Sequence, residues 1–419
     1  MKTQIDHILT PETERHFFQE QLLPPLLRGE CTTVMWFPHG GVRTQFNFLI
    51  SHADSFGYSQ LGKYRIVYID PNDLLNYSPE GCFNLMRQKL AISNQENMGD
   101  DLMSLKICME NILAQDTHVI FIMSYFDKLL FGNNFLQNLY GLYQIDRRKV
   151  HFIFVNSNNI LDKSVLLSYG HFAKLLLQNV VYFPILSEDD AKVVGLRINR
   201  GYGLTETTVN MLIRLVGGHP SLIYHSLSLI NKNSDSISTN AIEWLTDQPE
   251  MKLILNDIWN TFSAEEQRLL LVLAGGDHLV VNASDYLLKM NYIKNDKGCY
   301  SLFPPIFKTY IEKLKKVKPT IIIDKESEQI LVKSLFAKKK ITANEYLLLS
   351  NLLKTPNKVV SRDRISEILW GDMACEKYSD WAIDQTVFQL RRKLSEVGIP
   401  STSIQTIKGQ GYRWLQDVS

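Results

Sequence analysis

Two amides, a hydroxyl and two cations lie close together near the end of the chain, in SDWAIDQTVFQLRRKL (379–394). These side chains are Gln385, Thr386, Gln389, Arg392 and Lys393. Gln and Arg can bridge base edges in a DNA major groove, while Arg and Lys also bind phosphates. The stretch therefore predicts a helix that reads DNA, with a solvated amphipathic helix as the alternative.

A second group of residues could hold phosphate, in FPHGGVRT (37–44), directly after an apolar run. The group has the length of the nucleotide motif GxxxxGK[ST], in which backbone N–H groups, a Lys and a hydroxyl hold phosphates and magnesium. Phe37 and Val42 replace its glycines, and Arg replaces its Lys. The remaining candidates for nucleotide contact are Gly40, Gly41, Arg43 and Thr44.

The residues that hydrolysis requires are missing from their expected positions. A later apolar run ends in Ser124 and Tyr125, where carboxylates would hold magnesium and orient water, and Asp127 comes two to three residues too late. Because a hydroxyl and a phenol stay neutral near pH 7, we predict that the chain is not an enzyme. His219, in the turn GGHP, could contact a base or phosphate, but the turn is first of all a helix stop.

The elements that would position these groups follow from the apolar pattern. Five runs alternate with helical periods and predict a parallel α/β sheet, at 31–37, 63–70, 117–124, 149–157 and 179–186. Near the C-terminus, Ile383, Val387, Leu390 and Leu394 form the apolar stripe of the predicted DNA helix. Strand-like runs at 404–407 and 412–415 then enclose the basic, Gly-rich tip KGQG and predict a hairpin wing.

Residues 320–419 resemble the winged-helix effector domain of OmpR/PhoB-type response regulators. The resemblance rests on ITANEYLLLSNLL, VVSRDRISEILWG, the D-xx-ID-x-x-V-xx-LRRKL helix and the QT-x-KG-x-GYRW wing. It implies a recognition helix after Asp380, a wing in the minor groove, and backbone contacts from two further residues, Arg362 and Trp370. The full predicted DNA-contacting set is Arg362, Trp370, Gln385, Thr386, Gln389, Arg391, Arg392, Lys393, Thr406, Lys408 and Arg413. Family members often carry a cation where this chain has Phe388 and Gln389, so the base preference of relatives does not transfer.

The N-terminal part resembles a degenerate AAA/STAND-like core of the P-loop NTPase class with a helical lid. The predicted domains are a degenerate P-loop NTPase-like α/β domain (1–186), the lid (187–240), a middle winged helix (241–317) and the OmpR/PhoB-type winged helix (318–419). The core is interpreted as a platform without hydrolysis, as a switch loaded with ATP or ADP, or as a slow hydrolase. No cofactor is required, and ATP or ADP is the candidate ligand.

Composition limits the remaining classes. Of 45 basic and 44 acidic residues, 16 and 12 lie from Lys318 onward, so positive charge is concentrated in the predicted DNA module. Five scattered cysteines without CxxC spacing argue against disulfides and zinc and suit a reducing cytoplasm. We expect no membrane span. The chain is expected to be a bacterial, cytoplasmic transcription regulator that binds double-stranded DNA and uses its core for self-association or for a protein partner.

Overall fold

The structure is a computed structural model that describes residues 7–90, 102–129, 131–233, 240–276, 284–316, 321–324, 329–332, 337–371, 380–396 and 399–415. The chain forms two compact units, residues 1–310 and 311–419. Their division falls inside helix α16 (Pro305–Lys316), shortly before the predicted domain boundary at 317. The finer division into four domains stays a prediction.

A five-stranded parallel sheet forms the core of the first unit, in the order β2-β3-β4-β1-β5. The strands are β1 (Thr32–Trp36), β2 (Lys63–Ile69), β3 (Thr117–Met123), β4 (Val150–Asn156) and β5 (Val180–Phe183). Each lies within one of the five predicted runs, so the predicted parallel α/β sheet is confirmed. Continuous apolar runs form such strands because both faces of a parallel sheet are covered by helices.

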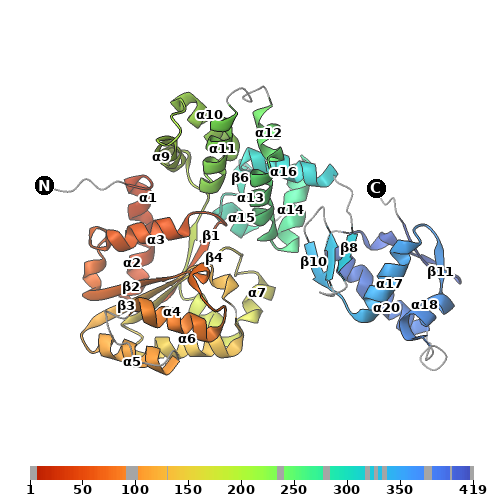
Figure 1. The fold of residues 1–419 in the computed structure, drawn as a ribbon, viewed down its shortest axis with the longest axis horizontal. Coiled ribbons are helices and arrows are strands. Elements are labelled where there is room, and N and C mark those ends of the chain that lie inside the picture. Colours follow the sequence, from red (N-terminus) through yellow and green to blue (C-terminus); the bar gives the residue numbers. More distant parts are fainter. Residues whose placement is uncertain are drawn as a thin grey trace. The chain divides into compact units, whose positions relative to one another are not determined.

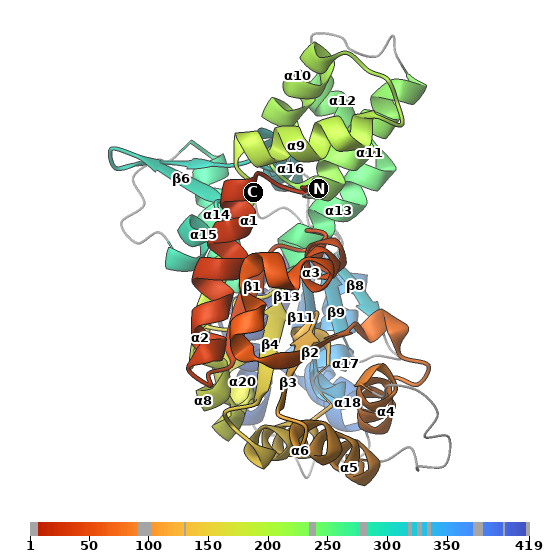
Figure 2. The same ribbon diagram turned by 90° about the vertical axis from the view of Figure 1, so that its left-hand side faces the viewer.

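Helices cover both faces of this sheet (Figure 1). The chain moves from β1 to β2 in one direction along the sheet and then returns through β3 and β4, so right-handed crossovers place α3 on the face opposite α4 to α6. Figure 2 shows the N-terminal helices beside α3. The helices around the sheet are α1 (Pro11–Arg15), the π-helix η1 (His16–Leu22), α2 (Leu23–Leu27), α3 (Val42–Ser51), α4 (Pro79–Leu90), α5 (Leu102–Leu113), α6 (Asn133–Ile145), α7 (Lys163–Ser168) and α8 (Ala173–Leu176).

Short 3-10 helices occur at bends of the chain, as η2 (Ala53–Phe56), η3 (Tyr58–Leu61), η4 (Pro71–Asp73), η5 (Phe126–Lys128) and η6 (Gly170–Phe172). Because β1 lies between β4 and β5, the loop that leaves β1 opens at the carboxyl edge, in the interior of the sheet. Ligands of open α/β sheets bind at this edge, where the strand order reverses. The fold thus brings the candidate phosphate loop to the place where it could act.

Helices follow the sheet to the end of the first unit. They are α9 (Glu188–Asn199), α10 (Glu206–Val216), α11 (Pro220–Lys232), α12 (Ala241–Asp247), α13 (Pro249–Asn260), α14 (Ala264–Ala274) and α15 (Asp285–Lys289), followed by the hairpin strands β6 (Ile293–Asp296) and β7 (Cys299–Leu302). The GGHP turn joins α10 to α11 as predicted. Ser263 and Glu266 form a capping box at the start of α14. The middle winged helix stays a prediction.

The second unit contains a compact three-helix module with a hairpin. Its elements are β8 (Ile321–Asp324), β9 (Gln329–Val332), β10 (Ala337–Lys340), α17 (Ala343–Lys354), β11 (Val359–Ser361), α18 (Arg362–Trp370), α20 (Asp380–Glu396), η9 (Ser401–Ser403), β12 (Ile404–Ile407) and β13 (Gly411–Trp414). Strands β10-β9-β8 and β11-β13-β12 form two antiparallel sheets. Thr342 and Glu345 form a capping box at the start of α17. The module is the expected winged helix.

Candidate functional sites

Helix α20 has one buried face and one exposed face. Ile383, Val387, Leu390 and Leu394 are almost fully buried in the core of the winged helix. Gln385 and Arg392 are exposed on the other side, whereas Thr386 and Gln389 are half-buried. The Thr386 hydroxyl donates to the carbonyl of Ala382, 2.9 Å away. The amides and one cation of the predicted set are therefore in a position to meet a ligand.

Arg391, by contrast, is engaged inside the domain. Its Nε and one terminal nitrogen donate to the carbonyl of Ile404 at 3.0 and 2.6 Å, and the same terminal nitrogen donates to the Thr406 hydroxyl at 2.8 Å. The guanidinium carbon also lies 5.8 Å from the centre of the Tyr412 ring. These contacts fix the recognition helix to strand β12 at the base of the wing. Arg391 thus has a positioning role in this structure.

Two other predicted cations also have partners within the module. The Lys393 ammonium lies 2.6 Å from the Glu345 carboxylate, and both side chains are largely buried. Arg362 bridges Asp380 and Asp384 at 2.8 and 2.7 Å. Since Tyr412 also donates to Asp384, this network joins the starts of α18 and α20 to the wing. Trp370 packs against the core at the end of α18.

The wing is a tight turn with an exposed cation at its tip. Gln410 N–H donates to the Ile407 carbonyl at 3.0 Å, and Gly409 adopts φ +70°, which a side chain would disfavour. Lys408 is exposed at this tip, and Thr406 is exposed on the strand that leads to it. Arg413 is half-buried and donates from Nε to the Gln405 side chain at 2.7 Å. Lys408 is the wing cation that this geometry presents to solvent.

In the first unit, aromatic side chains fill the loop between β1 and α3. A Cβ atom at Gly40 would lie 2.3 Å from Nε1 of Trp36 and 2.6 Å from the Phe37 ring. Trp36 stacks in turn on Phe183 with ring centres 3.9 Å apart. Val42, which replaces the last glycine of the motif, is buried at the start of α3. Close packing against these rings thus requires a glycine at position 40.

Arg43 points to carboxylates of the same unit. Its side chain pairs with Asp73 and lies 3.4 Å from Asp70, while Lys89 pairs with Asp73 at 2.6 Å. The hydrogen bond that Arg43 donates to Asp73 raises the pKa of Arg43, and Lys89 and Arg43 together lower the pKa of Asp73. Thr44 is exposed next to Arg43. The cation that the motif would offer to phosphate is already paired.

His219 is fully buried and is bonded to the loop itself. Its Nε2 donates to the Pro38 carbonyl at 2.8 Å, and burial lowers the pKa of the imidazole to about 3. The Ser221 hydroxyl donates to the His39 carbonyl at 2.9 Å, and the His39 ring pairs with Asp257 at 2.8 Å. A Cβ atom at Gly218 would lie 2.0 Å from the Leu186 carbonyl, so the turn fits closely against the exit of β5. These hydrogen bonds hold the turn between α10 and α11 against the loop between β1 and α3.

The carboxyl ends of β3 and β4 are joined by an acid that lies off the expected magnesium position. Ser124 is buried at the end of β3, and Tyr125 is half-buried beside it. The Asp127 carboxylate accepts from the N–H of Ser157 at 3.2 Å and from its hydroxyl at 2.9 Å. Burial raises the pKa of Asp127. This acid holds the two strand ends together.

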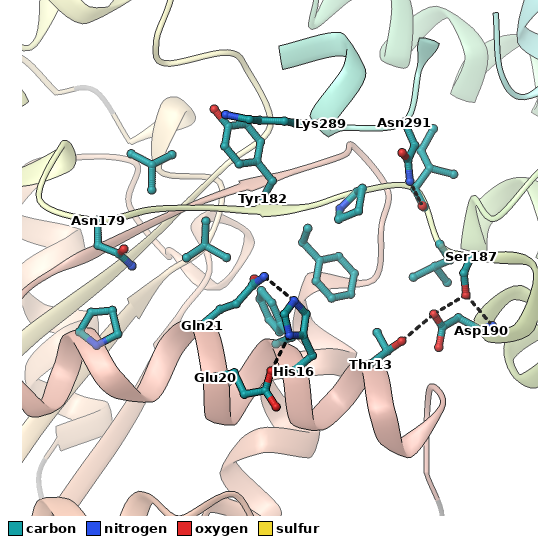
Figure 3. Close-up of a pocket in the computed structure, with 18 of the residues that line it drawn as sticks. Thr13, His16, Glu20, Gln21, Asn179, Tyr182, Ser187, Asp190, Lys289 and Asn291 are labelled. Atoms are coloured by element: carbon teal, nitrogen blue, oxygen red, sulfur yellow. Dashed lines mark hydrogen bonds and ion pairs between the residues drawn. The ribbon is translucent and has the colours of Figure 1, made fainter. Parts of the chain in front are cut away.

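A cleft of about 720 Å³ lies elsewhere, between the N-terminal helices and the edge strand β5 (Figure 3). Thr13, His16 and Gln21 point from the helices toward the strand, and the Lys289 ammonium lies 4.9 Å from the Tyr182 ring. Asp190 closes one end by accepting from the Thr13 hydroxyl at 2.9 Å. The residues predicted to contact nucleotide are absent from the lining of this cleft.

The comparison with known sequences concerns the second unit. Residues 337–414 match the family described as "Transcriptional regulatory protein, C terminal". The chain is 38% identical over 89 residues to the uncharacterized transcriptional regulatory protein YvcP of Bacillus subtilis, which covers 21% of this chain and 34% of that protein. It is 35% identical over 77 residues to the transcriptional regulatory protein BaeR of Escherichia coli, covering 18% and 31%. The chain spans about a third of the length of these relatives.

Two solved structures are also similar. The walker-type ATPase paby2304 of Pyrococcus abyssi matches 74% of this chain and 98% of its own, at 16% identity and a TM-score of 0.48. The DNA-binding domain of response regulator AdeR matches 24% of this chain and all of its own, at 24% identity and a TM-score of 0.21. The second unit contains an OmpR/PhoB-type winged-helix DNA-binding domain, and the first unit is built on a five-stranded parallel sheet covered by helices. Within the described ranges, no helix has both the length and the apolar character to cross a membrane.

Proposed function

We propose that this protein is a sequence-specific DNA-binding transcription regulator whose α/β core is a platform that does not hydrolyse nucleotide. The observation that carries this proposal is the hydrogen bond from His219 to the Pro38 carbonyl, which fixes the turn between α10 and α11 to the candidate phosphate loop. A loop that binds phosphate needs room beside its backbone and a cation directed at the ligand. Here aromatic rings occupy the space beside Gly40, and the cation, Arg43, is paired with Asp73.

The residues present do not fit magnesium nucleotide. Magnesium in such sites is held by oxygen ligands, among them a hydroxyl and a carboxylate. Thr44 supplies the hydroxyl, but Ser124 and Tyr125 end β3, and the Asp127 carboxylate is engaged by Ser157. We therefore assign the core a sensing or oligomerising role. Two copies on paired half-sites would compensate for the modest positive charge of the DNA module.

A nucleotide-loaded switch is the second candidate, and one observation favours it. Within the described part of the chain, Trp36 Nε1, Gln45 Oε1, Asn156 Oδ1 and His219 Nδ1 are buried without a hydrogen-bond partner. Trp36 and His219 border the loop, Gln45 lies in the first turns of α3, and Asn156 pairs with Met35 in the sheet. Buried polar atoms need a partner, which a bound ligand or water would supply.

Calorimetry with the purified full-length chain separates these functions. Titration of ATP and of ADP, with magnesium, should give no binding heat, and hydrolysis should stay at background. Arg43→Ala and Thr44→Ala serve as matched variants because both residues are exposed on one turn of α3. Nucleotide binding that Arg43→Ala abolishes would support the switch. Magnesium-dependent turnover that either variant abolishes would overturn the platform.

DNA binding is tested separately by titrating the chain with a pool of random-sequence duplexes at several salt concentrations. The affinity should fall as salt increases, since phosphate contacts release counterions. Addition of ATP should leave the affinity unchanged. A chain that fails to bind any duplex at low salt would contradict the proposed regulator.

A further inference from the structure

Two large rings stand exposed on the recognition helix. Trp381 is 71% exposed and Phe388 is 58% exposed. Together with Gln385 and Arg392 they recur at positions 381, 385, 388 and 392, which is helical spacing. At 3.6 residues per turn, this stripe is centred about 160° around the helix from the buried stripe of Ile383 to Leu394. The rings are therefore on the face most distant from the domain's own core.

The rings are too far from that core to be part of it. Exposed aromatic groups that lie side by side on a folded domain mark a binding surface more often than a lone exposed residue does. Trp381 and Phe388 are separated by about 10 Å along the helix axis, at 1.5 Å per residue. This length corresponds to about three base pairs at 3.4 Å each. Both rings can thus face bases of one half-site.

The partners of the neighbouring cations limit which bases the exposed face of α20 can contact. Arg391 donates to Ile404 and Thr406, and Lys393 pairs with Glu345. The exposed Arg392 lies beyond Phe388, at the C-terminal end of the stripe, and not between the two rings. Between the two rings, Gln385 is the side chain that shares their face. Cations on this stretch would favour guanine, whose O6 and N7 accept hydrogen bonds. An apolar ring instead meets the one apolar group of the major groove, the C5-methyl of thymine.

We propose that Phe388 and Trp381 read thymine methyl groups and that Gln385 reads adenine, so that the half-site of this protein contains A·T pairs at the centre of the recognition helix. This assignment rests on the proposed DNA-binding function and states its base preference. It also gives a role to Phe388 at a position where the resemblance to response regulators leads one to expect a cation.

The experiment begins with selection of the full-length chain on a random-sequence duplex pool. Each thymine of the recovered half-site is then replaced by deoxyuridine, which removes only the methyl group. Each methyl in contact with a ring should contribute about a fourfold difference in affinity, as expected for one buried methyl-sized group. At the thymine that Phe388 contacts, Phe388→Ala should bind the thymine duplex about as weakly as the wild type binds the duplex with uracil at that position, and it should no longer distinguish the two.

Three further variants make the result specific. Phe388→Leu keeps an apolar side chain and should retain part of the methyl dependence. Phe388→Arg should shift the selected sequences toward G·C pairs at that position. Leu347→Ala, at an apolar side chain that is 37% exposed on α17, is the matched control and should change neither affinity nor selection. Thermal unfolding of every variant checks that the domain remains folded.

The outcomes are distinct. A chain that binds the selected duplex with the same affinity after every thymine is replaced would overturn the methyl assignment and leave the proposed function intact. Loss of self-association in Phe388→Ala, with methyl dependence unchanged, would show that the ring docks protein and would also overturn the assignment. Failure to bind any duplex would contradict the proposed function itself.

Discussion

The recognition helix and the loop after β1 both retain parts of a familiar motif, but their polar groups have opposite fates. In α20 the cations Arg391 and Lys393 hold the helix in place, and the exposed face beside them remains available to a ligand. Around the loop, Arg43, Ser221 and His219 bond to groups of the same unit, and rings occupy the space beside Gly40.

The difference shows that internal bonding can leave one set of polar groups exposed and engage another set within the fold. A binding face needs one set of polar groups to fix the scaffold and a second set that stays exposed. Helix α20 has both sets. Beside the loop after β1, Arg43 is exposed but paired with Asp73, and Thr44 is exposed next to it.

Lys393→Met should have the largest effect on stability. It leaves the Glu345 carboxylate buried without its cation, and removal of one partner of a buried ion pair costs about 3 kcal/mol or more. Chemical denaturation of the full-length chain, followed by the Trp fluorescence of the second unit, measures this loss. Lys354→Met, at an exposed position on α17, is the control and should change stability by less than about 0.5 kcal/mol. Equal stability of the two variants would show that Lys393 is not part of the scaffold.

Arg391→Ala and Arg392→Ala should separate scaffold from binding face. Loss of the charged hydrogen bonds to Ile404 and Thr406 should destabilise the winged helix by about 2 kcal/mol in Arg391→Ala. Arg392→Ala should instead weaken DNA binding by about 1–3 kcal/mol. Thermal unfolding and DNA titration are measured on both. The contrast fails if Arg391→Ala keeps full stability and loses only DNA affinity.

The buried imidazole of His219, which is bonded to the loop after β1, should make the stability of the first unit sensitive to acid. His219 has a folded pKa of about 3, below the value near 6.5 of an unfolded histidine, so the unfolded chain binds more protons below pH 6.5. The contribution of the neutral His219 to the free energy of unfolding is fully present above about pH 6.5, and it is lost as the pH falls toward 3, by about 1.4 kcal/mol per pH unit.

Urea denaturation at pH 7, 6 and 5 measures this slope, and His219→Gln should reduce it by about one proton. His151→Gln is the matched comparison. Burial, and then the charge of His118, lower the pKa of His151 to about 4, so this histidine contributes with the same sign. A slope that His219→Gln does not alter would mean that the imidazole is not buried as a neutral group.

Lys408→Ala should have the smallest effect. The exposed cation at the tip of the wing should contribute about one unit to the slope of log affinity against log salt, which the variant loses. Gln410→Ala, at an exposed neutral residue of the same turn, is the control and should leave the slope unchanged. The same slope in both variants would place the wing away from the DNA.

Elements whose local pattern is strong were predictable from sequence. All five strands of the sheet, the capping boxes at Thr342 and Ser263, and the hairpin of the wing lie where the pattern places them. The π-helix η1 was not predicted, because a wider helical turn has no distinct apolar period. The predicted nucleotide and DNA contacts of single residues stay predictions, since a residue type states what a side chain can bind and not which partner it meets.

Local sequence patterns account for the winged helix, the parallel sheet, and Ser124 and Tyr125 at the end of β3, because apolar periodicity, turn residues and residue type are local properties. The tertiary structure alone decided which polar groups remain available. Arg391 meets Ile404, Lys393 meets Glu345, and His219 meets Pro38 across separations of 13, 48 and 181 residues. Such pairings depend on how elements pack, and packing is a property of the whole fold that no short stretch of sequence contains.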